Sequence, residues 1–322
     1  MAGGFVLAHL SDLHLGPLER SPLGLLNAKR VLGAANWHRA RRHVHDPRVA
    51  ELAIAEIHKL GADHIAISGD LCNLGLPAEH ERALEALRRW GGEGRISVVP
   101  GNHDIYSRIG RDPGTERWRP YMTSCARGLE LGGAAGAFPF VRVLGKGDGA
   151  IALIGVNSAL ETPPFRAHGR IGTAQLDAAA GCLERAGRAG LVRVVMLHHP
   201  PLAALGQRWK ELLDAPALEA VLMRSGADLV IYGHNHVVDL RRLGGAEGGA
   251  LVSGIGSGSA RRDHDGEPTA RLALYGFGEP AGQIEVRVYG FDPLSNAFRR
   301  MPEEENVRSA QRHHPAAPAS AG

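Results

Sequence analysis

The sequence contains few cysteines. Only Cys72, Cys125 and Cys182 occur in 322 residues, and they are far apart. An odd number at wide spacing gives neither a disulfide framework nor the paired thiolates of a structural zinc site. This composition is typical of a protein from a reducing compartment.

Long apolar runs are also missing. No stretch approaches the roughly 18 apolar residues that a membrane-spanning helix needs. The first residues, MAGGFVLAHLSDLHLG, carry no basic segment before their apolar stretch, which argues against a secretory signal. We therefore expect a cytoplasmic protein without an integral membrane segment.

The sequence has no strong excess of one charge sign. Its 37 Lys and Arg residues nearly balance 34 Asp and Glu residues, giving a formal net charge of +3, so charge alone does not predict nucleic-acid binding. A hydrophobic fraction of 44% is close to the globular average and allows a core to form. The unusual number is 17 histidines, because imidazole binds metals and carries protons near neutral pH.

Short apolar runs of β type recur along the chain, and each ends in polar residues or glycine. Segments with apolar residues at helical spacing lie between several of them, for example in residues 49–60. This alternation predicts a layered α/β domain. The predicted strands are Phe5–Leu10, His64–Ser68, Ile96–Val99, Ile151–Val156, Arg193–Leu197 and Leu229–Tyr232.

The pattern changes after about Val237. Closely spaced β runs follow with Gly-rich connections and no helical spacing between them, which predicts a second, more antiparallel sheet. Residues 301–322 are polar and rich in Ala and Pro, and we expect a disordered tail there. The later predicted strands are Val237–Leu243, Ala250–Ser253, Arg271–Tyr275 and Ile284–Tyr289.

Side chains of metal-ligand type directly follow five of the predicted strands. Because α/β folds present functional groups at strand ends, we expect these side chains to meet. Side chains two residues apart in an extended chain point the same way, so Asp12 and His14 can bind one ion together. The candidate ligands are Asp12, His14, Asp70, Asn102, His198, His234 and His236.

These imidazoles, carboxylates and the amide form a mixed nitrogen and oxygen set, which suits Mn²⁺, Fe²⁺ or Fe³⁺, or Zn²⁺. Seven ligands are too many for one tetrahedral ion, but they suit two ions if one carboxylate bridges them. Asp70 is the candidate for that bridge. The sequence therefore predicts two divalent metal ions per chain.

Five short motifs occur in a fixed order between Asp12 and His236: D-x-H, G-D, G-N-H-D, H-x-P and G-H-x-H. In these motifs the chain resembles the calcineurin-like metallophosphoesterase family. The resemblance implies a four-layer α/β/β/α sandwich of two packed sheets flanked by helices, forming one catalytic domain over residues 1–300. His198 is preferred to His199 because it stands two residues before Pro200, as the family pattern requires.

The resemblance also implies a role for each matching residue. His103 would contact the substrate, and Asp104 would orient its ring. Asp12, His14 and His236 would hold the first metal, Asn102, His198 and His234 the second, and Asp70 would bridge them. A metal-bridging hydroxide would attack the phosphorus of an anionic phosphate ester, while His103 stabilises the transition state or protonates the leaving oxygen.

Basic residues concentrate between positions 29 and 48, around Trp37. One interpretation is a solvated face on a loop insertion. Others are a clamp for an anionic substrate, or a basic helix in peripheral contact with a membrane, which would place the protein at the inner membrane face. The candidate substrate-binding residues of this segment are Lys29, Arg30, Arg39, Arg41 and Arg42.

Three functions remain open at this point. The first is a metal-dependent phosphodiesterase, because many family members with the D-x-H histidine cleave diesters. The second is a lipid-linked pyrophosphate hydrolase of the UDP-diacylglucosamine type at a membrane surface. The third, a non-catalytic scaffold with the same fold, should have lost ligands, and all seven are present. Other histidines, including His45 and His64, are interpreted as surface or core residues.

Overall fold

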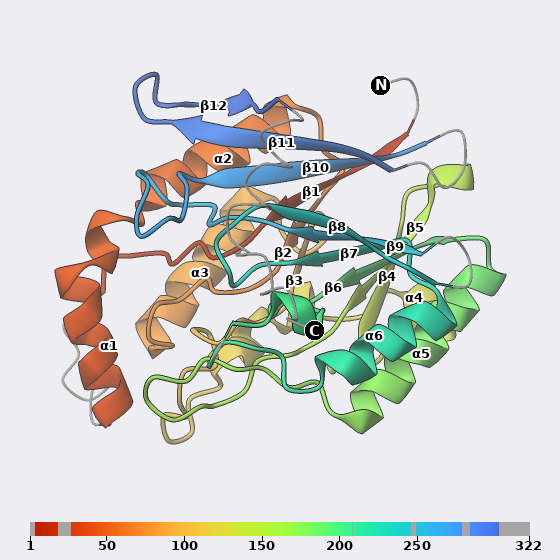
Figure 1. The fold of residues 1–322 in the computed structure, drawn as a ribbon, viewed down its shortest axis with the longest axis horizontal. Helices are drawn as coiled ribbons and strands as arrows, with labels where there is room; N and C mark the ends of the chain where they lie inside the picture. Colours follow the sequence, from red (N-terminus) through yellow and green to blue (C-terminus); the bar gives the residue numbers. More distant parts are fainter. Residues whose placement is uncertain (1–3, 19–26, 208, 246–248, 279–283, 303–322) are drawn as a thin grey trace, which may run out of the picture.

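Two six-stranded sheets form the centre of the molecule (Figure 1). The structure, a computed structural model, describes residues 4–18, 27–207, 209–245, 249–278 and 284–302. In spatial order the first sheet contains β12 (Ala297–Arg300), β11 (Ile284–Asp292), β10 (Arg271–Phe277), β1 (Phe5–Leu10), β2 (His64–Ile67) and β3 (Ile96–Val98). The second contains β4 (Phe140–Leu144), β5 (Ile151–Gly155), β6 (Val192–Met196), β7 (Leu229–Tyr232), β9 (Ala250–Gly254) and β8 (Asp239–Leu243).

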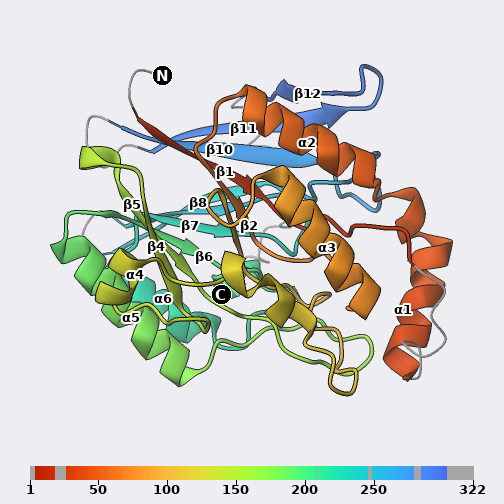
Figure 2. The same cartoon turned by 180° about the vertical axis from the view of Figure 1, so that it is seen from behind.

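Helices cover the outer face of each sheet, as the view from behind also shows (Figure 2). Helices α2 (Pro47–Lys59) and α3 (Pro77–Trp90) lie on the first sheet, and α5 (Thr173–Arg188) and α6 (Ala215–Ser225) lie on the second. The two remaining α-helices of the described chain are α1 (Ala28–Arg39) and the short α4 (Ala126–Glu130). This is the predicted four-layer α/β/β/α sandwich.

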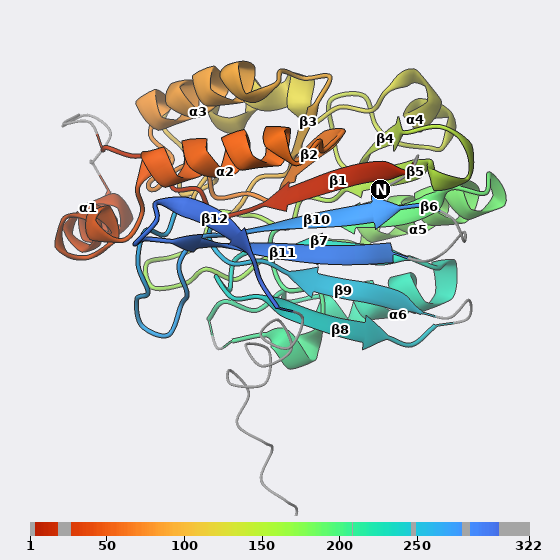
Figure 3. The same ribbon diagram turned by 90° about the horizontal axis from the view of Figure 1, so that it is seen from above.

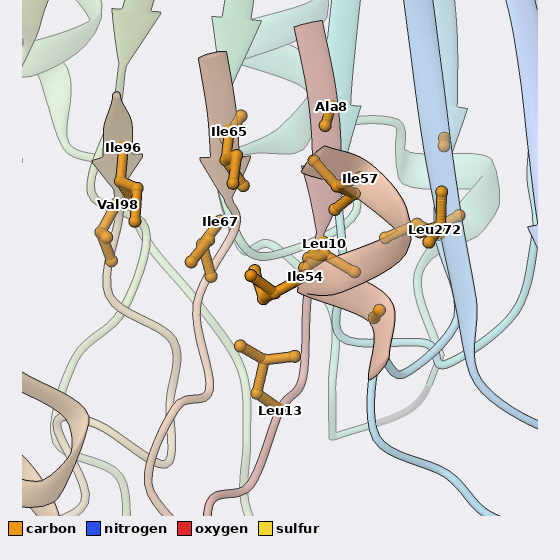
Figure 4. Packing of buried hydrophobic residues seen from close by; sticks show 14 of the residues in the cluster. Ala8, Leu10, Leu13, Ile54, Ile57, Ile65, Ile67, Ile96, Val98 and Leu272 are labelled. Carbon is orange, nitrogen blue, oxygen red and sulfur yellow. The ribbon is translucent and has the colours of Figure 1, made fainter. Parts of the chain in front are cut away.

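Apolar residues on both faces of each sheet hold the layers together. Along β5, Ile151 and Leu153 join the core between the sheets, whereas Ala152 and Ile154 join the core under α5 and α6. Successive strand residues point to opposite faces, so a continuously apolar strand can serve both cores. On the first sheet, Ile54 and Ile57 of α2 pack against strand residues such as Leu10 (Figure 4).

Strands β1, β2 and β3 are parallel, as are β5, β6, β7 and β9. The carboxyl end of β1 points toward the end of the sandwich where α1 lies (Figure 3). Because neighbouring parallel strands end at the same edge of a sheet, the loops that follow them gather at this end.

The prediction of a separate antiparallel sheet after Val237 was wrong. Strands β8 and β9 extend the second sheet through β7, and β10 and β11 extend the first sheet through β1. Turn and alternation signals are local and do not specify which existing sheet edge a strand joins.

Strands β4 and β12 were not predicted, because polar residues interrupt their apolar patterns. Arg142 lies in the middle of β4 and is buried, and it donates hydrogen bonds to backbone carbonyls that include Thr123 and Ile96. The domain end at residue 300 stays a prediction. The expected tail lies, from residue 303 onward, outside the described residues.

The basic segment is a helix rather than a loop insertion. The Asn27 side chain accepts a hydrogen bond from the backbone N–H of Arg30 and caps the start of α1. A 3₁₀ turn over Arg41–His43 follows and leads into α2. Among the helices of the described ranges, none combines the length and apolar character needed to cross a membrane.

Candidate metal centre

The loops after β1, β2, β3, β6 and β7 bring all seven predicted ligands to one end of the sandwich. All seven side chains are buried. Their metal-binding atoms form two groups, each with its atoms within 4.8 Å of one another: Asp12 with His14 and His236, and Asp70 with His198 and His234. Asn102 joins the second group, since its Oδ1 lies 3.1 Å from His198 Nε2.

In the first group, His14 presents a free lone pair. Its Nδ1 lies 3.0 Å from the carbonyl oxygen of Cys72 and can only donate there, which leaves Nε2 as an acceptor. That Nε2 atom is buried and has no hydrogen-bond partner. An orphaned, buried acceptor beside the Asp12 carboxylate is what a cation site requires.

The other imidazole of this group, His236, lies between two carboxylates. Its Nε2 is 3.1 Å from Asp12 Oδ1, and its Nδ1 is 2.7 Å from Glu267 Oε2. Although burial disfavours the charged imidazole, Asp12 and Glu267 raise the pKa of His236 to about 10. A cation bound to Asp12 and Nε2 would take the place of that proton.

In the second group, acceptor atoms face one another. His198 Nδ1 donates to the Ser68 carbonyl at 2.7 Å, and His234 Nε2 donates to the Lys210 carbonyl at 3.1 Å. Their other nitrogens, His198 Nε2 and His234 Nδ1, are 3.1 Å apart. Burial lowers the pKa of both imidazoles, so two neutral lone pairs point at one spot, an arrangement that a shared cation would stabilise.

The carboxylates fit cations for the same reason. Burial and the nearby charges of Asp12 and Asp104 raise the pKa of Asp70 well above its usual value. Its Oδ2 lies 3.5 Å from His198 Nε2, and its Oδ1 accepts the backbone N–H of His103 at 2.7 Å. Divalent cations would offset the repulsion among these carboxylates. The donor set therefore fits two metals.

The backbone at this centre is strained. Five of the seven residues have positive φ, between 43° for His14 and 70° for His234. Such conformations cost about 1–3 kcal/mol each and are typical of functional sites. Gly69, with φ at 99°, makes a sharp turn before Asp70. Gly101 does not turn in this way; it is needed because a Cβ there would overlap the Asp70 carboxylate.

A sequence model of calcineurin-like phosphoesterases matches residues 5–238, most of the chain. The chain belongs to this family. The resemblance in the five motifs is thereby confirmed. Among curated proteins, no sequence matches this calcineurin-like phosphoesterase.

Solved structures with the same fold include metal-dependent phosphatases. A dimetal phosphatase from Danio rerio aligns with a TM-score of 0.57 at 14% identity, over 88% of this chain and 94% of the other. Purple acid phosphatase PPD1 from yellow lupin, Lupinus luteus, gives 0.55 at 11% identity over 100% and 58%. The sulfate thiohydrolase SoxB from Thermus thermophilus gives 0.52 at 16% identity over 95% and 59%. At these identities the likeness shows the shared fold.

In this calcineurin-like phosphoesterase, His103 and Asp104 do not pair as expected. The His103 Nδ1 faces the Asn73 carbonyl, and its Nε2 lies 2.9 Å from Arg41 Nη1. The expectation that Asp104 orients the ring is corrected: Asn73 and Arg41 contact it.

Asp104 instead braces the loops that carry the ligands. Its buried carboxylate accepts backbone N–H groups of Asp70 at 2.8 Å and of Cys72 and Gly101 at 2.9 Å. Three backbone amides thus share the two oxygens of this carboxylate. Asp104 therefore fixes the loop after β2 to the loop after β3.

The five candidate basic residues have different surroundings. Arg41 lines the metal centre, and Arg39 lines both the centre and a neighbouring cleft. Lys29 lines that cleft and donates to the Tyr106 carbonyl and to Thr162 Oγ1, both at 2.9 Å. Arg30 is buried and donates to the carbonyls of Leu74, Gly75 and Ser107, so it fastens α1 to the fold. Arg42 is exposed and donates to His43.

Sequence reasoning missed two groups that contact the first cluster. Glu267 belongs to the segment between β9 and β10, where no motif marks it. His45, interpreted as an ordinary surface or core residue, is buried with its ring 4.5 Å from that of His14. Its Nδ1 lies 3.0 Å from Ser259 Oγ. Only the folded chain brings these positions together.

Proposed function

We propose that this protein hydrolyses phosphate esters with two divalent cations. Asp12, His14 and His236 would hold the first, Asn102, His198 and His234 the second, and Asp70 would bridge them. The observation that carries this proposal is the pair of buried clusters whose acceptor atoms face one another. The cations would neutralise the phosphoryl oxygens and activate the attacking water. The donor set suits Mn²⁺, Fe²⁺ or Fe³⁺, or Zn²⁺.

Arg41 and His103 would act as a pair on the substrate. The Nδ1 proton of His103 is donated to the Asn73 carbonyl. Arg41 Nη1 lies 2.9 Å from His103 Nε2 and 3.2 Å from Nδ1, so the guanidinium lies against the ring at the wall of the centre. Burial and the charge of Arg41 lower the pKa of His103 well below its usual value. A neutral ring that holds Arg41 supports stabilisation of the transition-state charge rather than protonation of the leaving oxygen.

The preferred reaction in this proposal is diester cleavage. A cleft of about 660 Å³ adjoins Asn102 and His103, which gives room for an organic group beside the scissile phosphate. The alternative, a lipid-linked pyrophosphate hydrolase, is favoured by Val31 and Leu32 of α1, which are 54% and 44% exposed. A scaffold that has lost its chemistry is disfavoured, because every expected ligand lies in a cluster.

The test uses purified full-length protein loaded with Mn²⁺. We expect two metal ions per chain by elemental analysis and hydrolysis of bis-p-nitrophenyl phosphate that EDTA abolishes. Cyclic AMP and UDP-diacylglucosamine in the same panel distinguish the two substrate classes. Sedimentation with anionic liposomes tests membrane contact. A protein that binds no metal after reconstitution would overturn the proposal and favour the scaffold.

A further inference from the structure

The cleft beside the metal centre has two unlike walls. One is the face of α1 that carries Leu32, Asn36 and Arg39, and the other is formed by two loops, residues 164–167 and 209–210. The Ala167 N–H donates to the Trp209 carbonyl at 2.8 Å, so the two loops are joined. The inner end of the cleft is formed by Asn102, His103 and Tyr106.

Two aromatic residues of the loop wall have strained backbones and exposed side chains. Phe165 has φ of 63° and is 84% exposed, and Trp209 has φ of 73° and is 39% exposed. Large side chains rarely adopt this conformation. Burial does not explain it here, because much of each side chain remains in solvent.

The other non-glycine residues of the described chain with positive φ show where such backbone strain occurs in this protein. Among nine such non-glycine residues, five are the candidate ligands described above, and Asp265 lines the pocket that contains them. Only Asn296, in the turn between β11 and β12, lies away from the centre and the cleft. Phe165 and Trp209 therefore share a feature that otherwise marks the metal centre.

The charge of the cleft is positive. Lys29, Arg39, Arg166 and Lys210 line it, and no acidic side chain does so among the residues that the structure describes. The Arg166 guanidinium carbon lies 3.5 Å from the centre of the Trp209 ring, and Lys29 Nζ lies 4.3 Å from that of Tyr106. Cations stacked on aromatic rings form a surface that suits a flat, anionic ligand.

We infer that this cleft binds the organic group of the ester, and that this group is aromatic and carries a negative charge besides the scissile phosphate. The inference rests on the proposed function and names its substrate class. Phe165 and Trp209 would pack against the ring, and Arg39 and Arg166 would bind the additional charge. An aliphatic chain would use the apolar surface but not these cations.

The test measures binding of three phosphonates to the Mn²⁺-loaded protein by calorimetry, a readout that does not need turnover. Ethylphosphonate, phenylphosphonate and 4-phosphonobenzoate share the metal-binding group, and the last two add a ring and then a carboxylate. We expect phenylphosphonate to bind about three- to tenfold more tightly than ethylphosphonate. The carboxylate should tighten binding again.

Four variants test which residues cause the tighter binding of the ring and of the carboxylate. Phe165→Ala and Trp209→Ala should each reduce the preference for the ring, and Arg39→Ala and Arg166→Ala should each reduce the preference for the carboxylate. Leu294→Ala, at an exposed apolar residue of the β11–β12 turn, and Arg224→Ala, at an exposed cation of α6 outside the cleft, are the matched controls and should change neither.

Equal affinity for the three phosphonates in a protein that binds Mn²⁺ would overturn the inference and leave the proposed hydrolase standing. Tighter binding of hexylphosphonate than of phenylphosphonate would also overturn it and indicate an aliphatic occupant. Failure to bind Mn²⁺ at all would instead overturn the proposed function, and the inference with it.

Discussion

The Nδ1 atom of His236 lies 2.7 Å from Oε2 of Glu267, on the side of the ring opposite Asp12. A carboxylate behind a metal-binding imidazole fixes the orientation of the ring and increases its basicity. Glu267 comes from the segment between β9 and β10, so the first cluster depends on a part of the chain beyond the five motifs.

Replacing Glu267 should therefore weaken the binding of one metal more than the binding of the other. We expect Glu267→Gln to lower the affinity for the first metal about 10–100-fold while the second cluster keeps its metal. Titration with Mn²⁺ followed by calorimetry resolves the two sites. The control is Asp265→Asn, at a neighbouring residue that lines the same pocket without contacting His236. An equal loss at both sites would contradict the assignment of Glu267 to the first cluster.

The seven candidate ligands could be predicted because each directly follows a strand or lies in a short motif. Glu267 and His45 could not, because their neighbours are distant in sequence. The same limit applies to the fold: the strands after Val237 were identified, but their division between two sheets depends on edges formed elsewhere in the chain. Local patterns predict elements and strand ends, and tertiary contacts decide what surrounds them.

The binding of both metals should depend on Asp70. Its Oδ2 lies 3.5 Å from His198 Nε2 in the second cluster, and burial and the charge of Asp12 in the first cluster raise its pKa. The Asp70 carboxylate therefore interacts with both clusters. We expect Asp70→Ala to lose both metals and nearly all turnover of bis-p-nitrophenyl phosphate. Elemental analysis measures the first effect. Asp112→Ala removes a carboxylate that binds Arg117 instead and should retain two metals and full activity. Retention of one metal in Asp70→Ala would argue against a bridge.

Arg41 and His103 should behave as one unit. Each single variant, Arg41→Ala and His103→Ala, should keep both metals and reduce kcat by about 10²-fold, because both disrupt the same guanidinium position. The double variant should be little worse than either one, since groups that act together are not additive. Arg224→Ala, at an exposed cation of α6 that lines neither the centre nor the cleft, serves as the control. Loss of metal in His103→Ala, or fully additive losses of kcat in the double variant, would show that Arg41 and His103 do not act as a pair.

His64 should make the protein sensitive to mild acid independently of the metals. It is buried in β2 with its Nε2 2.9 Å from Ser97 Oγ, and burial, helped by the charges of Arg142 and Arg95, lowers its pKa from 6.5 to about 3. Between these values the unfolded chain binds more protons than the folded one, so stability falls as the pH falls below about 6.5.

From pH 7 to pH 5 this single group should remove about 2 kcal/mol from the free energy of unfolding. Urea denaturation of wild type and His64→Gln at both pH values measures the effect, and the variant should lose about 2 kcal/mol less than wild type over that interval. His38→Gln, at an exposed histidine of α1, should lose as much as wild type. The same loss in His64→Gln would mean that the His64 imidazole becomes protonated without cost inside the sheet, against what its burial predicts.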